Sequence, residues 1–333
     1  MTAAAATLRP SEGLAASAGR VFRRNTWTIG LVGLLIAFLV LTRILAPNYG
    51  LANLQSLAIS ALPLALAAVA QAIVVIAGGI DLSIGSIMAF TSVTAAVAMQ
   101  NQSEEVGILV AVAVLALGLV VGAVNGILVV GTRVPDIVVT LAMLFVWAGA
   151  ALLVLDRPGG AASDWLMALI SGPLELAWLP RALVVLIVLV AAVWIPVSRS
   201  SLGVSLYAIG SNRLAAYRSG VAVSRTKIAS YVLAGFFAAA GGLALTASTG
   251  SAQPVPGPYT VQSVAAIVLG GVSLAGGKGN LVGPILAVYI LSLLRTDLTF
   301  IGVNPSLSTA LQGAILVGVV MFGAALTFRR KNA

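Results

Sequence analysis

Long runs of apolar residues alternate with short polar connections along nearly the whole chain. A helix needs about 20 apolar residues to cross the roughly 30 Å hydrocarbon core of a bilayer. The pattern therefore predicts an all-α polytopic membrane protein with about ten transmembrane helices. The eighth run is short and rich in glycine, so we expect it to be broken or re-entrant. The runs lie at residues 27–46, 52–78, 84–100, 106–130, 137–155, 181–197, 228–249, 260–276, 281–299 and 307–328.

The composition agrees with a lipid environment. Of the 333 residues, 60% are hydrophobic and only 8% are charged, whereas a soluble domain carries about a quarter charged residues. The chain has no cysteine and no histidine. This excludes disulfides, thiolate nucleophiles, catalytic triads with histidine and metal sites built on either residue. We expect no catalytic, cofactor-binding or metal-binding residues in this chain.

The basic residues indicate an orientation. If the N-terminus is cytoplasmic and the runs alternate, only Arg43, Arg157, Arg181 and Arg295 of the 18 basic residues fall outside. An excess of Lys and Arg on cytoplasmic loops sets the orientation of membrane proteins. We therefore expect both termini in the cytoplasm. The net charge of +9 is then a topology signal, and we expect no nucleic-acid partner.

This division gives a cytoplasmic tail over residues 1–26, a transmembrane domain over 27–328 and a short cytoplasmic tail over 329–333. The first run has nearly the length of a signal-peptide core. No small-residue cleavage site follows it, so we interpret it as an uncleaved first helix.

The sequence shows no source of energy for transport. A transporter driven by ions usually keeps an ionisable group deep in the bilayer, but Asp81, Asp136 and Asp297 fall at or near the ends of runs. The segment 270–279 superficially resembles a phosphate-binding loop. That motif requires glycine where Val272 stands and Ser or Thr where Gly279 stands. If this protein pumps, the energy comes from another subunit.

Two glycine-rich segments are candidates for a translocation path. In the first, Gly78 and Gly79 precede Asp81 and Ser83. One interpretation is a tight turn in which Asp81 or Ser83 caps the following helix; the other is a helix break that lines a transport path. The second, with five glycines over 270–279, must be buried in protein or line water. Their similarity suggests an inverted internal repeat. The candidate path residues are Gly78, Gly79, Asp81, Ser83, Gly270, Gly271, Ser273, Gly276 and Gly277.

The longest polar segment, residues 198–228, lies between the sixth and seventh runs. Ser211 or Asn212 can cap a short helix over residues 213–218, which Gly220 can end. A short helix at the membrane face suits docking of a soluble partner, but a basic anchor on anionic membrane lipid fits equally well.

Three runs of sequence resemble a known family. AGGIDLSIGS at 77–86, YAIGSNRLAAYRSGV at 207–221 and AAIVLGGVSLAGGKGNLVG at 265–283 are similar to the membrane permeases of bacterial ABC importers for monosaccharides. This is the ribose/xylose/galactofuranose-type branched permease family, and the resemblance extends from about residue 50 to 325.

The resemblance implies a permease subunit in the bacterial inner membrane that forms the path for a monosaccharide by alternating access. Its implied partners are cytoplasmic ABC ATPase subunits that use ATP, an extracytoplasmic sugar-binding protein and a second permease copy or a paralogue. The resemblance identifies no residues of the permease that bind the sugar. It favours docking at the 198–228 segment, with ATPase-coupling residues Gly210, Asn212, Arg213, Ala215, Ala216, Ser219 and Gly220.

Two other functions remain as alternatives. A secondary transporter or facilitator would work without an ATPase subunit. An intramembrane enzyme acting on lipid would need a cluster of acids, His or Cys within the bilayer, and the sequence shows none.

Overall fold

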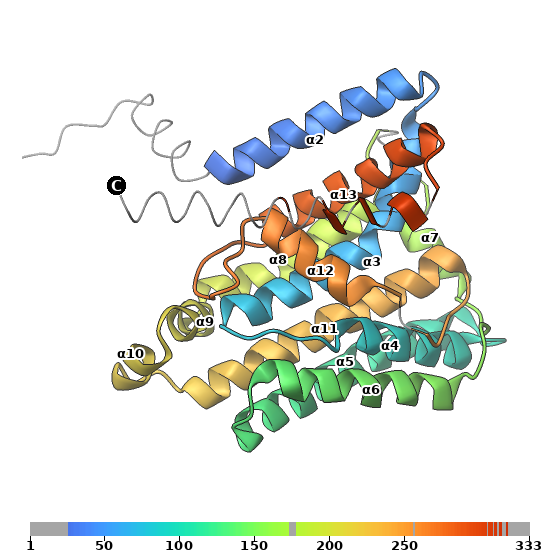
Figure 1. The fold of residues 1–333 in the computed structure, drawn as a ribbon. Coiled ribbons are helices and arrows are strands. Elements are labelled where there is room, and N and C mark those ends of the chain that lie inside the picture. The colour runs from blue at the N-terminus through green and yellow to red at the C-terminus, as the bar shows by residue number, and fades with distance from the viewer. Residues whose placement is uncertain are drawn as a thin grey trace, which may run out of the picture.

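The computed structural model describes residues 26–172, 178–255 and 257–304, with scattered positions between 306 and 318. Most of the expected N-terminal tail and of the tenth run therefore lies outside the described residues. The elements are α2 (Thr26–Leu45), α3 (Leu51–Ile76), α4 (Ile84–Met99), α5 (Glu104–Thr132), α6 (Asp136–Val154), α7 (Asp164–Ile170), α8 (Arg181–Arg199), α9 (Ser201–Ser211), α10 (Arg213–Arg218), α11 (Val223–Thr249), α12 (Tyr259–Leu269) and α13 (Val282–Phe300) (Figure 1).

Seven of these helices are long and apolar enough to cross a membrane: α2, α3, α5, α6, α8, α11 and α13. The third and eighth predicted runs instead form α4, with 16 residues, and α12, with 11 residues. At 1.5 Å per residue these helices reach only about 24 and 17 Å, so neither crosses the bilayer alone. The eighth run is broken, as predicted, but its predicted end at residue 276 was wrong. Its helix ends at Leu269 because Gly271 takes a positive φ of 82°.

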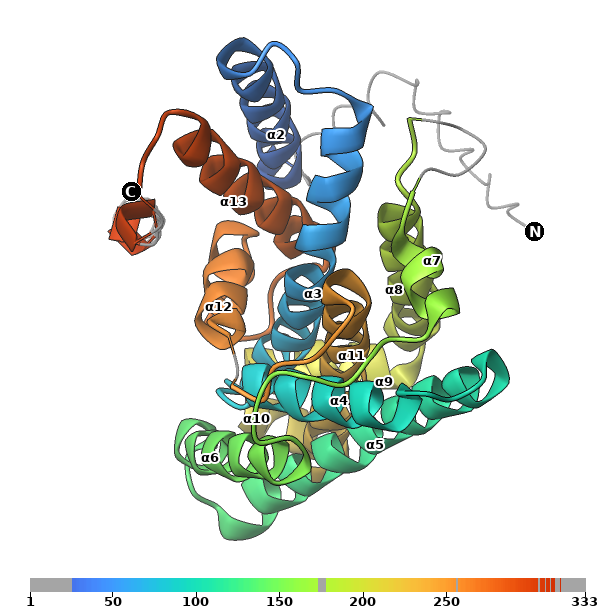
Figure 2. The same ribbon diagram turned by 90° about the vertical axis from the view of Figure 1, so that its right-hand side faces the viewer.

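The centre of the bundle consists of α3 and α11, whose residues are mostly buried. The outer helices α2, α6 and α8 bury few of their side chains, as expected of surfaces that face lipid. Figures 1 and 2 show α2 at one edge of the bundle and α6 at the opposite edge.

Close backbone contact joins α5 to α11. A Cβ atom on Gly122 would overlap the Tyr231 carbonyl oxygen, and one on Gly126 would lie 2.9 Å from the Ile228 Cα. Gly118 meets Gly235 in the same way. Small residues spaced four apart allow helices to approach this closely in a membrane.

The two short helices begin inside the bundle. After α3 the chain runs back through residues 77–83 to α4, and after α11 it runs back through residues 250–258 to α12. The two helix starts meet, because Thr260 Oγ1 accepts a hydrogen bond from the Gly85 N–H at 2.9 Å. Ser92 and Thr246 pair at 2.8 Å, which joins the middle of α4 to the last turn of α11.

The short helices then diverge. α4 ends beside the 156–163 connection, where the Ala161 N–H donates to the Ala96 carbonyl oxygen. α12 ends beside the start of α2, where Trp27 Nε1 donates to the Leu269 carbonyl oxygen at 3.0 Å. Each of the two glycine-rich segments directly follows a helix end, Ile76 of α3 and Leu269 of α12. The inverted repeat itself stays a prediction.

The connections between helices gather at two opposite ends. Those predicted to be cytoplasmic meet at one end, as described below. At the other end, Glu104 accepts hydrogen bonds from the N–H groups of Asp164 and Trp165, and the Ala162 N–H donates to the Gly250 carbonyl oxygen. This arrangement agrees with the alternation, while the direction of the whole chain across the membrane stays a prediction.

Candidate functional site: the coupling segment and the glycine-rich turns

The predicted coupling segment and both glycine-rich segments meet at one point. A Cβ atom on Gly210 of α9 would overlap the Ile76 carbonyl oxygen and lie 2.6 Å from the Gly277 nitrogen. The Gly277 N–H also donates to the Ile76 carbonyl oxygen at 2.9 Å. Gly78 and Gly276 complete the contact, since a Cβ on Gly276 would lie 2.9 Å from the Gly78 Cα. The three segments therefore touch through backbone atoms, with no side chains between them.

A tyrosine strengthens this contact. The Tyr207 hydroxyl donates to the Gly279 carbonyl oxygen at 2.9 Å. Burial raises the pKa of the Tyr207 hydroxyl, so the group stays protonated and remains a donor. Sequence reasoning missed Tyr207, although the quoted run 207–221 begins with it.

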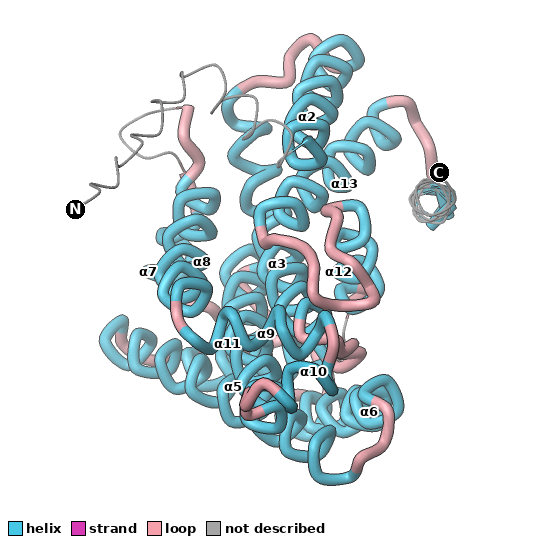
Figure 3. The backbone as a smooth tube through the Cα atoms, turned by 90° about the vertical axis from the view of Figure 1, so that its left-hand side faces the viewer, coloured by secondary structure: helices cyan, strands magenta, loops and turns pink. Residues whose placement is uncertain are grey.

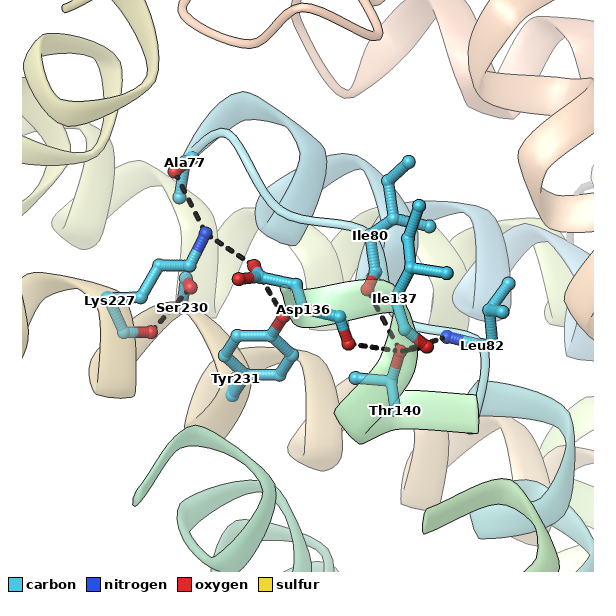
Figure 4. Close-up of polar contacts among 9 residues, drawn as sticks. All are labelled: Ala77, Ile80, Leu82, Asp136, Ile137, Thr140, Lys227, Ser230 and Tyr231. Atoms are coloured by element: carbon cyan, nitrogen blue, oxygen red, sulfur yellow. Dashed lines mark hydrogen bonds and ion pairs between the residues drawn. The ribbon is translucent and has the colours of Figure 1, made fainter. Parts of the chain in front are cut away.

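An ion pair between a buried lysine and a half-buried aspartate lies beside this contact (Figure 4). Lys227 Nζ at the start of α11 lies 2.6 Å from Asp136 Oδ2 at the start of α6. The Tyr231 hydroxyl donates to the same oxygen at 2.9 Å. Lys227 is only 7% exposed, and its Nζ is 3.5 Å from the Ala77 carbonyl oxygen. The pair therefore ties the starts of two helices to the turn that follows α3.

The ion pair was not predicted from the sequence. The charge pattern placed both residues on the cytoplasmic side but gave no reason to pair them. Only the fold shows that the ends of the fifth and seventh runs are neighbours, because a long stretch of chain separates Asp136 from Lys227.

The prediction that Asp81 or Ser83 caps α4 with its side chain was wrong. Ser83 stands at the cap position, but its side chain makes no capping hydrogen bond. Asp81 Oδ1 instead accepts hydrogen bonds from the Ser83 N–H at 2.8 Å and the Ser83 hydroxyl at 2.6 Å. Ser83 Oγ in turn accepts from Asn125 Nδ2 at 2.8 Å. Thr260 takes the expected role, because it accepts from the first turn of α4.

A second threonine supports the segment between α3 and α4. Thr140 Oγ1 accepts from the Leu82 N–H at 3.1 Å and lies 3.1 Å from the Ile80 carbonyl oxygen (Figure 4). Backbone groups buried in a membrane need such partners. The helix break is therefore real and held by side chains of neighbouring helices. A role in lining the transport path stays a prediction for these residues.

The other candidate path residues lie elsewhere. A Cβ atom on Gly271 would lie 2.5 Å from the Trp27 ring, and Gly270 contacts Gly283 and Pro284. The Ser273 N–H donates to the Lys278 carbonyl oxygen at 3.0 Å, which closes the loop on itself. The structure thus brings Gly78, Gly276 and Gly277 together and leaves Gly270 and Gly271 at the end of α12.

The coupling segment contains the short helix that the sequence predicts. Asn212 Oδ1 accepts from the Ala215 N–H at 2.9 Å, and Gly220 takes a positive φ of 84° after the helix ends. Ala216 is buried beside Ala77 and α11, whereas Ala215 is exposed. Two apolar side chains that sequence reasoning missed are also exposed, Leu214 at 58% and Tyr217 at 69%.

Replacing Asn212 with alanine is expected to loosen α10. The cap satisfies a free N–H of the first turn, and its loss costs about 0.5–2 kcal/mol. Amide hydrogen exchange of residues 213–218 in detergent should therefore become faster by roughly two- to thirtyfold. Asn212→Asp keeps an acceptor and should retain slow exchange. Equal exchange in all three proteins would contradict the capping role.

Similarity to known proteins identifies the family of the chain. The family described as the permease component of branched-chain amino acid transport systems matches residues 53–320. The chain belongs to this family. The permease is 33% identical to the ribose import permease protein RbsC of Escherichia coli strain K12, over 91% of this chain and 96% of that protein. No solved structure matches it.

Relatives of a second kind import autoinducer 2. The permease is 34% identical to the autoinducer 2 import system permease protein LsrC of Enterobacter sp. strain 638, over 79% of this chain and 76% of that protein. It is 28% identical to LsrD of Escherichia coli O9:H4, over 93% and 95%. The permease is thus a multi-pass inner-membrane component of an ABC importer. The expectations of no catalytic residue and no cofactor stay predictions.

Proposed function

We propose that the permease forms the translocation path for a monosaccharide in an ATP-driven importer and works by alternating access. The supporting observation is the backbone contact of Gly210 with the turn after α3 and with Gly277. A displacement of α9 and α10 has no flexible side chain to absorb it there. It would pass directly into the central helix α3, as a rigid-body transition between two states requires.

Cytoplasmic ABC ATPase subunits are the proposed partners of α10. The helix presents Leu214 and Tyr217 to the outside, between Arg213 and Arg218. Exposed apolar side chains at the tip of a short helix suit a protein cleft, where such residues contribute most of the binding energy. An extracytoplasmic sugar-binding protein and a second permease copy complete the proposed assembly. The monosaccharide class is supported by the name of the ribose import relative.

Replacing Tyr217 with alanine tests the docking. Loss of a buried aromatic anchor costs about 2 kcal/mol or more, so the cognate ATPase should bind the permease at least tenfold more weakly. Ala215→Trp, which adds bulk at an exposed position of α10, should weaken binding as well. The measurement is co-purification of the ATPase with tagged permease in detergent.

Ala215 and Ala216 are both predicted coupling residues, but they differ in burial. Ala216 is buried against neighbouring helices, so a bulky residue there would disturb the permease itself, and Ala215 is the informative site. Leu153→Ala, at an exposed position on α6, is the matched control and should leave co-purification unchanged. Normal ATPase yield with both Tyr217→Ala and Ala215→Trp would refute the assignment.

Reconstitution into liposomes tests the importer itself. Uptake of radiolabelled monosaccharide should require the permease, the ATPase subunit, the binding protein and ATP. Uptake by the permease alone, driven by an ion or substrate gradient, would show a secondary transporter or facilitator instead.

A further inference from the structure

Two cavities flank Tyr259, the first residue of α12. One, of about 210 Å³, lies between α3, α12 and α13 and is lined by Ser60, Gln262, Ser292, Arg295 and Thr296 as well as Tyr259. The other, of about 250 Å³, lies between α4, α11 and the connection before α12. Figures 2 and 3 show α12 beside α3 and α13 in this region.

The first cavity lies at the depth of the membrane interior, and the second extends from the start of α4 to the outer end of α11. Ser60 and Leu64 are near the middle of α3, and Ser292 is near the middle of α13. Gly85, in the first turn of α4, lines the second cavity together with Leu245 and Thr249 of the last turns of α11. The cavities therefore adjoin the point where the two short helices meet. Transporters commonly bind substrate near the bilayer midplane between such broken helices.

The cavity walls carry unused hydrogen-bonding groups. Within the described ranges, the Gln262 amide, the Tyr259 hydroxyl and the Ser292 hydroxyl have no hydrogen-bond partner, and neither does the Gln253 amide of the second cavity. Polar side chains at the depth of the first cavity are costly when they face lipid. This face of the bundle is therefore built to meet water or a polar solute.

The chemistry of the walls suits a small neutral polyol. Amide and hydroxyl groups each donate and accept hydrogen bonds, as the hydroxyls of a sugar do. The ring of Tyr259, between the two cavities, offers an apolar surface with a polar tip. Sites for drug-sized ligands have about 300–1,000 Å³, so cavities of 210 and 250 Å³ suit one small molecule.

We infer that the cavities flanking Tyr259 are where the permease contacts its monosaccharide in transit. The inference rests on the proposed function and adds the residues that touch the sugar: Tyr259, Gln262, Ser292 and Thr296 on the first cavity and Gln253 on the second. It separates sugar contact from the glycine contact around Gly210, which the proposed function assigns to coupling.

The absence of cysteine allows a direct labelling test. Single cysteines at Gln262 and Thr296 would be treated with a charged, water-soluble methanethiosulfonate in the assembled importer. Because the reactive thiolate requires an aqueous environment, both should react at least tenfold faster than Val261→Cys. Val261 is the matched control, since it is adjacent to Gln262 on α12 but is 67% exposed on a face outside the cavity. Equal rates at all three positions would overturn the inference.

Protection by sugar distinguishes a sugar site from a water-filled space. A mixture of D-ribose, D-xylose and D-galactose at tens of millimolar should slow labelling at Gln262→Cys and Thr296→Cys at least threefold and leave Val261→Cys unchanged. Fast labelling that the mixture does not slow would mean a hydrated cavity only, and would also overturn the inference.

Transport separates failure of this inference from failure of the proposed function. In the reconstituted importer, Gln262→Ala and Thr296→Val should take up at least tenfold less sugar per ATP hydrolysed than Val261→Ala. Thr296→Val keeps the shape of the side chain, so misfolding would not explain its loss. If the wild type itself shows no ATP-driven uptake, the proposed function fails. If the wild type transports and both variants match Val261→Ala, only the sugar site fails.

Discussion

Replacing Asp136 with alanine is expected to destabilise the folded permease by about 3–5 kcal/mol, because it leaves the buried Lys227 ammonium without its partner. The substitution also removes the acceptor of the Tyr231 hydroxyl, 2.9 Å away. A large fall in the midpoint of thermal unfolding in detergent should follow. The midpoint would be measured by size-exclusion chromatography of heated samples.

Two comparisons make this result specific. Asp156 forms an exposed pair with Arg157, in which Asp156 Oδ1 lies 3.9 Å from Arg157 Nε and the Asp156 side chain is 86% exposed. Asp156→Ala should therefore cost no more than about 1 kcal/mol of folding stability. The double substitution of Asp136→Leu with Lys227→Met replaces both charges with apolar groups and should recover most of the stability. A midpoint for Asp136→Ala equal to that of Asp156→Ala would contradict the structural role of the ion pair.

Replacing Gly210 with alanine is expected to abolish most ATP-driven uptake. The added Cβ overlaps the Ile76 carbonyl oxygen, so α9 must move away from the turn after α3. Overpacking of this kind costs about 1–3 kcal/mol, which the packing of the helices can tolerate. The contact proposed to carry movement is nevertheless opened. Uptake in reconstituted importers should fall at least tenfold while the permease still purifies as a folded protein.

The control is another glycine. Gly131, on α5, has nothing within 4 Å of a built Cβ, so Gly131→Ala should preserve uptake and add slightly to helix stability. Uptake by Gly210→Ala at the wild-type rate would show that the backbone contact does not transmit movement.

The sequence predicts most of the helices because each outer helix must present an apolar surface of nearly fixed length to lipid. It also predicts α10, since Asn212 and Gly220 satisfy local rules that need no tertiary information. The hydropathy of an apolar run does not, however, show how deep in the membrane its helix begins. The runs that became α4 and α12 are as apolar as their neighbours, and only the meeting of Gly85 with Thr260 shows that both begin inside the bundle.

The candidate site was predictable in part for the same reason. Glycines at 78, 210 and 277 stand out in the sequence, but their mutual contact depends on which helix ends are neighbours. The pairing of Asp136 with Lys227 depends on it too. The capping prediction for Asp81 and Ser83 was wrong because the serine hydroxyl and N–H both bind Asp81, while a threonine from a distant helix meets the first turn of α4.

The glycine face between α5 and α11 has a mechanical consequence. Because α5 and α11 are in backbone contact, they cannot slide or rotate independently, and the two helices move as one rigid body. With 27 residues, α11 extends roughly 40 Å, from Lys227 beside the coupling segment to Thr249 on the wall of the second cavity. A small rotation of this rigid pair about the coupling end therefore displaces the far end of α11 by a larger distance.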